Sequence, residues 1–230
     1  MTDAPVLLVT GASSGIGAQT ARRSAEAGWR VVLGARSEEK LEALVAELGE
    51  DEAAAVRCDV SSFEDQQALV AAALDRFGRL DAVFANAGFG AKRGFLEESV
   101  EHWRSMIDTN VLGVALSIRA ALPHMLEQGR GHVVLTGSVA GRRVLPGSLY
   151  SVTKWAVSAM GEALRQEVEE TPIRVTVVQP GMVDTPFFES GAPGFALADD
   201  DVARAVHYAL SEPPHVDVNE IVVRPVQPPG

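Results

Sequence analysis

The sequence predicts an α/β protein, with one doubly wound domain built on a seven-stranded parallel sheet and helices on both faces. Short, continuous apolar runs recur along the 230 residues, as expected for strands that are covered on both faces. Segments with helical periodicity alternate with these runs. No long linker, repeat or low-complexity segment interrupts the chain, so residues 1–230 are expected to form a single domain.

Seven runs rich in β-branched residues are the predicted strands, at residues 5–11, 30–36, 53–60, 80–88, 131–139, 174–181 and 220–225. Helices are predicted between them, at residues 14–28, 37–50, 62–78, 99–129, 150–170 and 199–212. Typical capping residues stand at the N-termini (Ser37, Ser61 or Ser62, Asp199 or Asp200) and at the C-termini (Gly28, Gly78). Pro123 is expected to kink the longest helix.

One long segment, residues 184–200, breaks this alternation. It is rich in Gly and Pro and carries Phe187, Phe188 and Phe195. Long loops inside compact domains are usually functional. We therefore predict a substrate lid whose apolar side chains face a ligand and exclude water, with a packed surface loop as the alternative.

Composition excludes several classes of function. The net charge of −11 argues against a nucleic-acid binder and against docking on anionic membranes, and any anionic ligand must be held by local positive groups. Cys58 is the only cysteine, which excludes an intrachain disulfide, and the five histidines lack ligand spacing, so we expect no catalytic metal. The N-terminus has no basic region and only a short apolar run, so we expect no secretion signal, no membrane span and a cytoplasmic location.

A glycine-rich string, TGASSGIG (residues 10–17), follows the first predicted strand and opens the first predicted helix. Gly11 permits a tight turn, while Gly15 and Gly17 let the backbone approach a phosphate and the sheet. The helix N-terminus offers unpaired N–H groups and partial positive charge to an anion. This arrangement predicts a dinucleotide pyrophosphate site, with a tight turn that binds no ligand as the alternative.

The end of the second predicted strand bears on the choice of dinucleotide. An acidic side chain at this place accepts hydrogen bonds from a ribose 2′-hydroxyl and repels a 2′-phosphate. This chain has Ala35 and Arg36 instead. A guanidinium suits a 2′-phosphate, so we predict NADP(H) rather than NAD(H). The alternative is that Arg36 is a solvated surface residue.

Tyr150 and Lys154 are four residues apart near the start of a predicted helix, so they share one face of it. A positive charge within reach is expected to lower the pKa of a phenol from about 10 towards neutral pH. A tyrosine of that kind is a useful general acid or base. The alternative is a pair of ordinary surface residues.

The order of these motifs resembles that of the short-chain dehydrogenase/reductase family. TGASSGIG is followed by CDV (58–60), NAG (86–88), Asn110, Ser138, YSVTK (150–154) and PGMVDT (180–185). The resemblance covers nearly the whole chain. It implies a Rossmann-type fold and an NADP-dependent oxidoreductase similar to those of a bacterial subgroup.

The resemblance also implies roles for the matched residues. Tyr150 would be the general acid in reduction and the general base in oxidation, with Lys154 lowering its pKa and holding the nicotinamide ribose. Ser138 would hydrogen-bond the substrate oxygen, and Asn110 would hold a water that relays protons to Lys154. The implied cofactor-binding residues are Gly11, Ser13, Ser14, Gly15, Ile16, Gly17, Arg36, Asp59, Val60, Asn86, Ala87, Gly88, Tyr150, Lys154, Pro180, Gly181, Val183 and Thr185.

Three functions remain open. The first is an oxidoreductase that interconverts a small secondary alcohol or hydroxy acid and a ketone, since the short C-terminal end resembles that of a subgroup acting on hydroxy acids. The second is a 3-oxoacyl-carrier-protein reductase, which needs a basic docking patch. Arg142 and Arg143 would be part of that patch, or bind a substrate carboxylate or phosphate, or be a solvated pair. The third is a non-catalytic NADP(H)-binding regulator.

The expected oligomer rests on the apolar faces of two predicted helices, residues 99–128 and the helix that carries Tyr150. These faces are broader than packing against one sheet requires. In members of the family that the chain resembles, the two helices pair across a two-fold axis. We therefore expect a homodimer or homotetramer.

Overall fold

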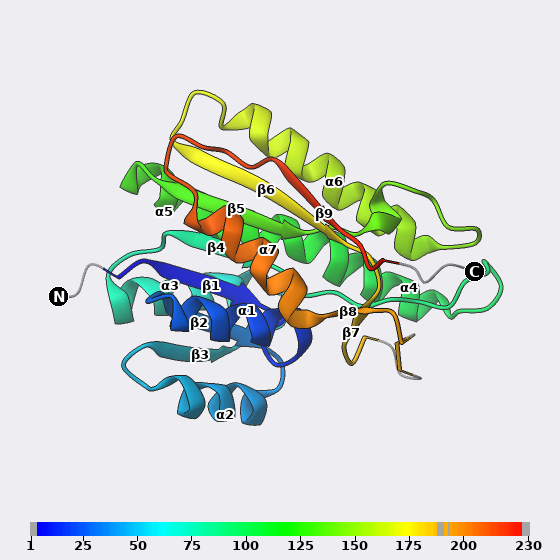
Figure 1. The fold of residues 1–230 in the computed structure, drawn as a ribbon, viewed down its shortest axis with the longest axis horizontal. Coiled ribbons are helices and arrows are strands. Elements are labelled where there is room, and N and C mark those ends of the chain that lie inside the picture. The colour runs from blue at the N-terminus through cyan, green and yellow to red at the C-terminus, as the bar shows by residue number, and fades with distance from the viewer. Residues whose placement is uncertain (1–3, 188–190, 193, 227–230) are drawn as a thin grey trace.

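Residues 4–187, 191–192 and 194–226 are described by the computed structural model, in which seven strands form one parallel sheet (Figure 1). The strands are β1 Val6–Thr10, β2 Arg30–Ala35, β3 Ala53–Arg57, β4 Ala82–Ala85, β5 Gly131–Thr136, β6 Ile173–Pro180 and β9 Glu220–Val223. Their order is β3-β2-β1-β4-β5-β6-β9, with every neighbouring pair parallel. The predicted fold class and the seven predicted strands are confirmed.

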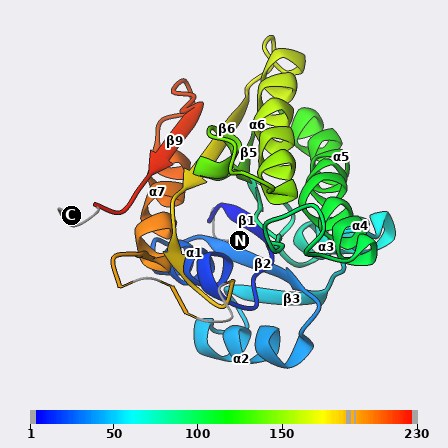
Figure 2. The ribbon, with the colours of Figure 1, turned by 90° about the vertical axis from the view of Figure 1, so that its right-hand side faces the viewer.

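Helices cover both faces of the sheet (Figure 2). They are α1 Gly15–Glu26, α2 Glu38–Leu48, α3 Phe63–Phe77, α4 Val100–Ile107, α5 Gly113–Gln128, α6 Leu149–Glu167 and α7 Asp199–Ser211. One buried apolar cluster joins α1, α2 and α7 to the sheet, and a second joins α3, α5 and α6 to its other face. Both faces of the central strands are buried, which explains their continuous apolar sequences.

The chain reverses its direction across the sheet between β3 and β4. It builds β1, β2 and β3 towards one edge, then returns to place β4 on the other side of β1. At such a switch point the loops that leave the two neighbouring strands diverge and open a crevice at the carboxyl end of the sheet. Figure 2 looks onto this end of the strands.

The stretch from Val100 to Gln128 is helical throughout, but its middle is not α-helical. A π-helical segment, Asp108–Leu112, separates α4 from α5. Pro123, the expected site of a kink, lies inside α5, which continues to Gln128. The change in helix type therefore lies around Asn110 instead, and π turns of this kind occur frequently at functional sites.

The same stretch is the one helix among the described residues that is long and apolar enough to cross a membrane, judged by length and composition alone. Its buried side chains, Val114, Ile118 and Met125 among them, belong to the cluster that packs against the sheet. Core helices of packed domains meet the same criterion, so this stretch is explained by its place in the fold.

Helix ends follow the sequence with one difference. Ser62 caps α3 by accepting a hydrogen bond from the Asp65 N–H, and Gly78 ends that helix in the left-handed conformation. At α7 the N-cap is Ala198 rather than Asp199 or Asp200. The Asp201 carboxylate accepts a hydrogen bond from the Ala198 N–H, so a carboxylate in the first turn satisfies one of the unpaired N–H groups at this helix end.

The predicted lid segment is tied together at its base. Val183–Asp184 (β7) and Leu197–Ala198 (β8) form a two-stranded sheet, where the sequence predicts only a loop. Two residues are too few to show the alternation that reveals a strand. Phe187 is exposed and Phe195 is half-buried, whereas Phe188 lies outside the described residues.

Candidate active site

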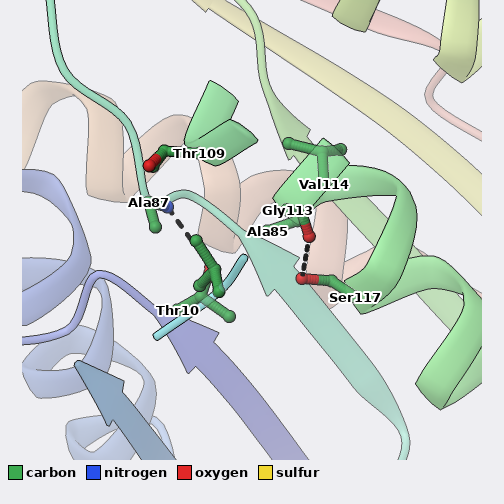
Figure 3. A pocket seen from close by; sticks show the side chains of 8 residues that line it. Thr10, Ala85, Ala87, Thr109, Gly113, Val114 and Ser117 are labelled. Atoms are coloured by element: carbon green, nitrogen blue, oxygen red, sulfur yellow. Dashed lines mark hydrogen bonds between the residues drawn. The ribbon is translucent and has the colours of Figure 1, made fainter. Parts of the chain in front are cut away.

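Three polar side chains form a hydrogen-bonded row across the carboxyl ends of β1, β4 and β5. Asn86 Nδ2 donates to the Thr10 carbonyl at 3.1 Å, and Asn86 Oδ1 accepts from the Thr136 hydroxyl at 3.1 Å. The Thr10 hydroxyl accepts from the N–H groups of Asn86 and Ala87, the second at 3.2 Å (Figure 3). The row fixes the chain through Asn86, Ala87 and Gly88, three predicted cofactor-binding residues.

The glycine-rich turn packs directly against this row. Gly11 has a φ of +66°, and a Cβ there would lie 2.9 Å from Ala87 Cα. A Cβ at Gly17 would lie 2.3 Å from the Gly11 carbonyl oxygen. Ser14 is the N-cap of α1, but its side chain makes no capping hydrogen bond. Close backbone and an open helix N-terminus are what a pyrophosphate needs, so the residues present fit a dinucleotide.

A small cavity lies beneath the row, between the ends of β1 and β4 and the start of α5 (Figure 3). Val60, Ala85 and Val114 line its apolar part. Two of its three hydroxyl groups have partners, since the Thr10 hydroxyl accepts from the Ala87 N–H and the Ser117 hydroxyl donates to the Gly113 carbonyl at 3.0 Å. We interpret the cavity as a packing gap under the groove.

Asn110 is fully buried, and its amide clamps the chain that follows Gly88. Its Oδ1 accepts from the Phe89 N–H at 3.0 Å, and its Nδ2 donates to the Phe89 carbonyl at 2.8 Å. Nδ2 also donates to the Thr153 hydroxyl at 3.2 Å. Both amide protons are thus used within the protein, so the structure gives Asn110 a clamping role that the sequence does not predict.

Ser138, Tyr150 and Lys154 converge beyond the carboxyl end of β5. The Ser138 hydroxyl accepts from the Ala140 N–H at 3.1 Å and is hydrogen-bonded to Tyr150. Lys154 Nζ donates to the Thr136 carbonyl at 2.7 Å and lies 5.8 Å from the centre of the Tyr150 ring. Ser138 and Lys154 are buried and Tyr150 is half-buried. The structure therefore brings these three predicted catalytic residues together.

The expected net lowering of the Tyr150 pKa is wrong for this structure. Burial raises the pKa of Tyr150 to about 12, and the hydrogen bond with Ser138 only partly opposes this increase. Burial likewise lowers the pKa of Lys154 to about 8. Lys154 Nζ donates its hydrogen bond to the Thr136 carbonyl. The loss of solvation is therefore the largest influence on the pKa of both Tyr150 and Lys154. The phenol is consequently protonated at neutral pH.

The end of the groove beside β2 and β3, where the adenosine of a dinucleotide is expected, carries charges of both signs. The Asp59 carboxylate accepts hydrogen bonds from the Ser61 N–H and hydroxyl, which hold its pKa below the ordinary value. Arg36 and Arg57 lower this pKa further through their charge, so both guanidiniums lie near Asp59. Arg57 pairs in register with Ala35 at the end of β2, which explains why it lies near Arg36.

The other wall of the groove comes from the chain after β6. Pro180 ends β6, and the Gly181 N–H donates to the Val223 carbonyl at 2.7 Å. Thr185 faces the glycine-rich turn, because a Cβ at Gly15 would lie 3.0 Å from Thr185 Cγ2. Val183 is buried. The predicted residues of the PGMVDT motif thus stand across the groove from the glycine-rich turn.

Phe187 extends this wall over Tyr150, one of the predicted catalytic residues. Its ring contacts that of Tyr150 edge to face, with 5.5 Å between the ring centres. A Cβ at Gly90 would lie 2.9 Å from Phe187 Cζ, so the ring fills a space that Gly90 leaves open. This aromatic ring shields one side of the phenol from water.

The two arginines after Ser138 have different surroundings. Arg142 forms an ion pair with Glu220 of β9, so its charge is already matched. Arg143 is exposed. Among the residues that the structure describes, no group of three or more His, Cys, Asp or Glu side chains is placed to hold a metal ion.

Sequence reasoning missed several residues that support the site. Thr10, Thr136 and Thr153 hold Asn86, Lys154 and Asn110 through hydrogen bonds. For Thr10 and Thr153, the only sequence signal is that each directly precedes a predicted site residue, Gly11 and Lys154. Arg57 had no such signal, because only the pairing of β2 with β3 places it beside Ala35.

Comparison with known proteins agrees with this geometry. The family model for short chain dehydrogenases matches residues 5–193. An uncharacterised oxidoreductase of Staphylococcus haemolyticus is 42% identical over 224 residues, which are 96% of this chain and 97% of the relative.

Solved structures are similar over nearly the whole chain. An alcohol dehydrogenase from the archaeon Thermococcus sibiricus, complexed with 5-hydroxy-NADP, has a TM-score of 0.90 and 35% identity, covering 99% of this chain and 100% of that one. The serine dehydrogenase of Escherichia coli has a TM-score of 0.86 and 33% identity, covering 94% and 96%. The chain is therefore an oxidoreductase of the short-chain dehydrogenase family.

Proposed function

We propose that this protein is an NADP(H)-dependent oxidoreductase that interconverts a secondary alcohol, or a hydroxy acid, and the corresponding ketone. The observation that carries the proposal is the convergence of Ser138, Tyr150 and Lys154 beside a glycine cradle that a dinucleotide fits. A regulator that only binds the cofactor would not need a buried lysine and a serine placed around a phenol. Their presence favours catalysis over the regulatory alternative.

The preference for NADP(H) is supported by charge at the adenosine end. Arg36 is exposed at the end of β2, and Arg57 of the neighbouring strand adds a second guanidinium. Two guanidiniums are well suited to a 2′-phosphate. Similar proteins were solved with both kinds of cofactor, since a serine dehydrogenase contains NADP+ and a 3-ketoacyl-(acyl-carrier-protein) reductase from Brucella melitensis contains NADH. Our choice of NADP(H) over NAD(H) therefore rests on Arg36 and Arg57.

The chemistry divides between the cofactor and the protein. A bound dihydronicotinamide supplies the hydride, and its oxidised form accepts one. Ser138 and Tyr150 can each donate a hydrogen bond to the substrate oxygen, where negative charge develops during reduction. Tyr150 then gives its hydroxyl proton to that oxygen. A protonated Lys154 beside the ring favours the phenolate that remains.

The pKa of Tyr150 gives the two directions different pH requirements. A phenol with a pKa of about 12 is ready to donate a proton at neutral pH, as ketone reduction requires. Alcohol oxidation needs the deprotonated phenol, which becomes more abundant as the pH rises. We therefore propose that the protein reduces ketones at neutral pH and oxidises alcohols better at alkaline pH.

The substrate is proposed to be a small carbonyl compound or hydroxy acid. The similarity to serine dehydrogenase supports this class. Reduction of 3-oxoacyl groups on a carrier protein is the second candidate, favoured by the Brucella melitensis reductase, which is 31% identical. A carrier needs a basic docking patch, and the pairing of Arg142 with Glu220 leaves little of one in this loop.

We also propose a cytoplasmic homodimer or homotetramer. Exposed apolar side chains lie on α4 and α6, and they include Val100, Ile107, Val152 and Trp155. A second copy of the chain would bury them. Light scattering at micromolar concentration should give a mass of at least two chains, and a monomeric mass would contradict the proposal.

A substrate panel tests the proposed function. NADPH oxidation is measured with ketones, keto acids and acetoacetyl-carrier conjugates, and NADP+ reduction with the matching alcohols and hydroxy acids. We expect turnover of at least one free ketone or keto acid, with lower efficiency for NADH than for NADPH. Turnover of carrier conjugates alone would establish the second candidate. Tight NADPH binding without any turnover would favour the regulator.

A further inference from the structure

Thr153 connects two parts of the site that are far apart in the sequence. It lies at the start of the second turn of α6, is 1% exposed, and is hydrogen-bonded to Asn110 of the π-helical segment Asp108–Leu112. Its Oγ1 accepts from Asn110 Nδ2 at 3.2 Å and donates to the Tyr150 carbonyl at 2.8 Å. The hydroxyl is therefore the link between Asn110 and the turn of helix that carries Tyr150.

The direction of these hydrogen bonds is fixed by the number of available protons. The Asn110 amide has two, one donated to the Phe89 carbonyl and one to Thr153. The Thr153 hydroxyl has one, which goes to the Tyr150 carbonyl. No donor is left over, and reversing any bond would leave a buried N–H unpaired, which is costly. The network accordingly has one arrangement.

The network also joins the walls of the groove. Asn110 clamps the chain at Phe89, which directly follows the cofactor wall at Gly88. Without the Thr153 hydroxyl, Asn110 would still hold the chain at Phe89. Asn110 itself would then lose its hydrogen bond to α6. A small displacement of a reacting group lowers catalytic rates strongly, even when the cause lies outside the reacting atoms.

We propose that Thr153 is a positioning residue, which acts through Asn110 and the Tyr150 carbonyl to set where the Tyr150 hydroxyl meets the substrate oxygen. The inference rests on the proposed function, in which Tyr150 transfers the proton. Thr153 itself is buried and is not proposed to touch substrate or cofactor.

The experiment compares Thr153→Val, which keeps the shape and removes the hydroxyl, with Thr153→Ser, which keeps the hydroxyl. Thr176→Val is the matched control. Thr176 is fully buried in β6, and its hydroxyl also accepts one hydrogen bond, from His132, and donates one, to the Val218 carbonyl at 2.6 Å. It has no contact with Tyr150 among the described hydrogen bonds.

We expect kcat to fall about tenfold to a hundredfold in Thr153→Val, while KM and the NADPH dissociation constant stay within about twofold. Thr153→Ser should restore most of kcat, and Thr176→Val should keep it. A kcat in Thr153→Val equal to that in Thr153→Ser would overturn the inference. So would an equal loss in Thr176→Val, since that would show a general effect of removing a buried hydroxyl.

A second readout does not depend on turnover. The chain has two tyrosines, Tyr150 and Tyr208, so a Tyr208→Phe background leaves one ring to observe. With tyrosine labelled at Cζ with ¹³C, the Tyr150 resonance should move in Thr153→Val and stay in place in Thr153→Ser. A resonance unchanged in both would reject the positioning role, even if the proposed function itself failed in the substrate panel.

Discussion

The two walls of the groove are built by different forces. In the catalytic wall (Asn86, Asn110, Ser138 and Lys154) buried polar side chains are held by hydrogen bonds, such as the 2.8 Å bond from Asn110 to Phe89 and the 2.7 Å bond from Lys154 to Thr136. In the loop wall (residues 183–187) the contact with Tyr150 is a ring contact, and Phe187 is 41% exposed.

This difference between the two walls suggests different roles for them in the proposed reaction. Hydrogen bonds at strand ends permit one geometry, as a proton transfer requires. An exposed ring in a loop can shift to fit different substrates. Under the proposed function, the reaction would take place at the catalytic wall and the loop wall would select the substrate, so changes in each wall should have different consequences.

The largest effect should come from Lys154→Met in the catalytic wall. Loss of the buried cation should lower kcat at least about a hundredfold, because it removes the charge that favours the phenolate. The same change should stabilise the fold below pH 8, by on the order of 1–3 kcal/mol, because burying the charged form is unfavourable. Urea unfolding at pH 7 measures this gain.

The pH dependence of that stability follows from linkage. Burial lowers the pKa of Lys154 from 10.5 to about 8, so between these values the unfolded chain binds more protons than the folded one. The unfolding free energy of the wild type, relative to that of Lys154→Met, should therefore rise with pH across this window. If the wild type and Lys154→Met had the same unfolding free energy at pH 7 and again at pH 10, this would contradict the burial of a charged lysine.

Alcohol oxidation should depend strongly on pH, and ketone reduction at neutral pH should not. Because the pKa of Tyr150 is raised to about 12, the fraction of phenolate in the free protein increases about tenfold for each pH unit below that value. The kcat/KM of oxidation should increase from pH 7 to 9, with a smaller slope above about pH 8, where Lys154 loses the charge that favours the phenolate. A profile that is flat over this range would show that Tyr150 is not the base.

Arg36→Ala should weaken NADPH binding roughly tenfold to a hundredfold, because charge-assisted hydrogen bonds contribute about 1.5–3 kcal/mol each. NADH binding should change less than about twofold. Arg57→Ala should also weaken NADPH binding more than NADH binding, but by a smaller factor than Arg36→Ala. Titration calorimetry with both nucleotides measures this. The control is Arg204→Ala, an exposed arginine on α7. Equal losses for NADPH and NADH would remove the basis for the predicted preference.

The smallest effect should come from the loop wall. Phe187→Ala should raise KM about twofold to tenfold, since an aromatic contact contributes about 0.5–1.5 kcal/mol, and kcat should change little. Gly90→Ala should act in the same direction, because its Cβ would lie 2.9 Å from Phe187 Cζ and displace the ring. Steady-state kinetics on an apolar ketone would measure the increase in KM. An unchanged KM in both variants would mean that the Phe187 ring does not contact the substrate.

The sequence predicts the catalytic wall better than the loop wall. Continuous apolar strands place Ser138 and the residues around Asn86 at one end of a parallel sheet, where the structure has them. The pKa of Tyr150 was predicted in the wrong direction, because spacing along a helix shows proximity but neither burial nor the partner of Lys154. The pairing of β7 with β8 and the packing of Phe187 on Gly90 depend on contacts that no local pattern encodes.

The most direct test measures kcat/KM across one substrate panel for the wild type, Tyr150→Phe and Phe187→Ala, with NADPH binding checked for each. We predict that Tyr150→Phe binds NADPH and loses about a hundredfold or more on every substrate alike. We predict that Phe187→Ala keeps its turnover but changes the order in which substrates are preferred. The opposite pattern, with substrate order altered by Tyr150→Phe and uniform loss of turnover in Phe187→Ala, would contradict the division between the two walls.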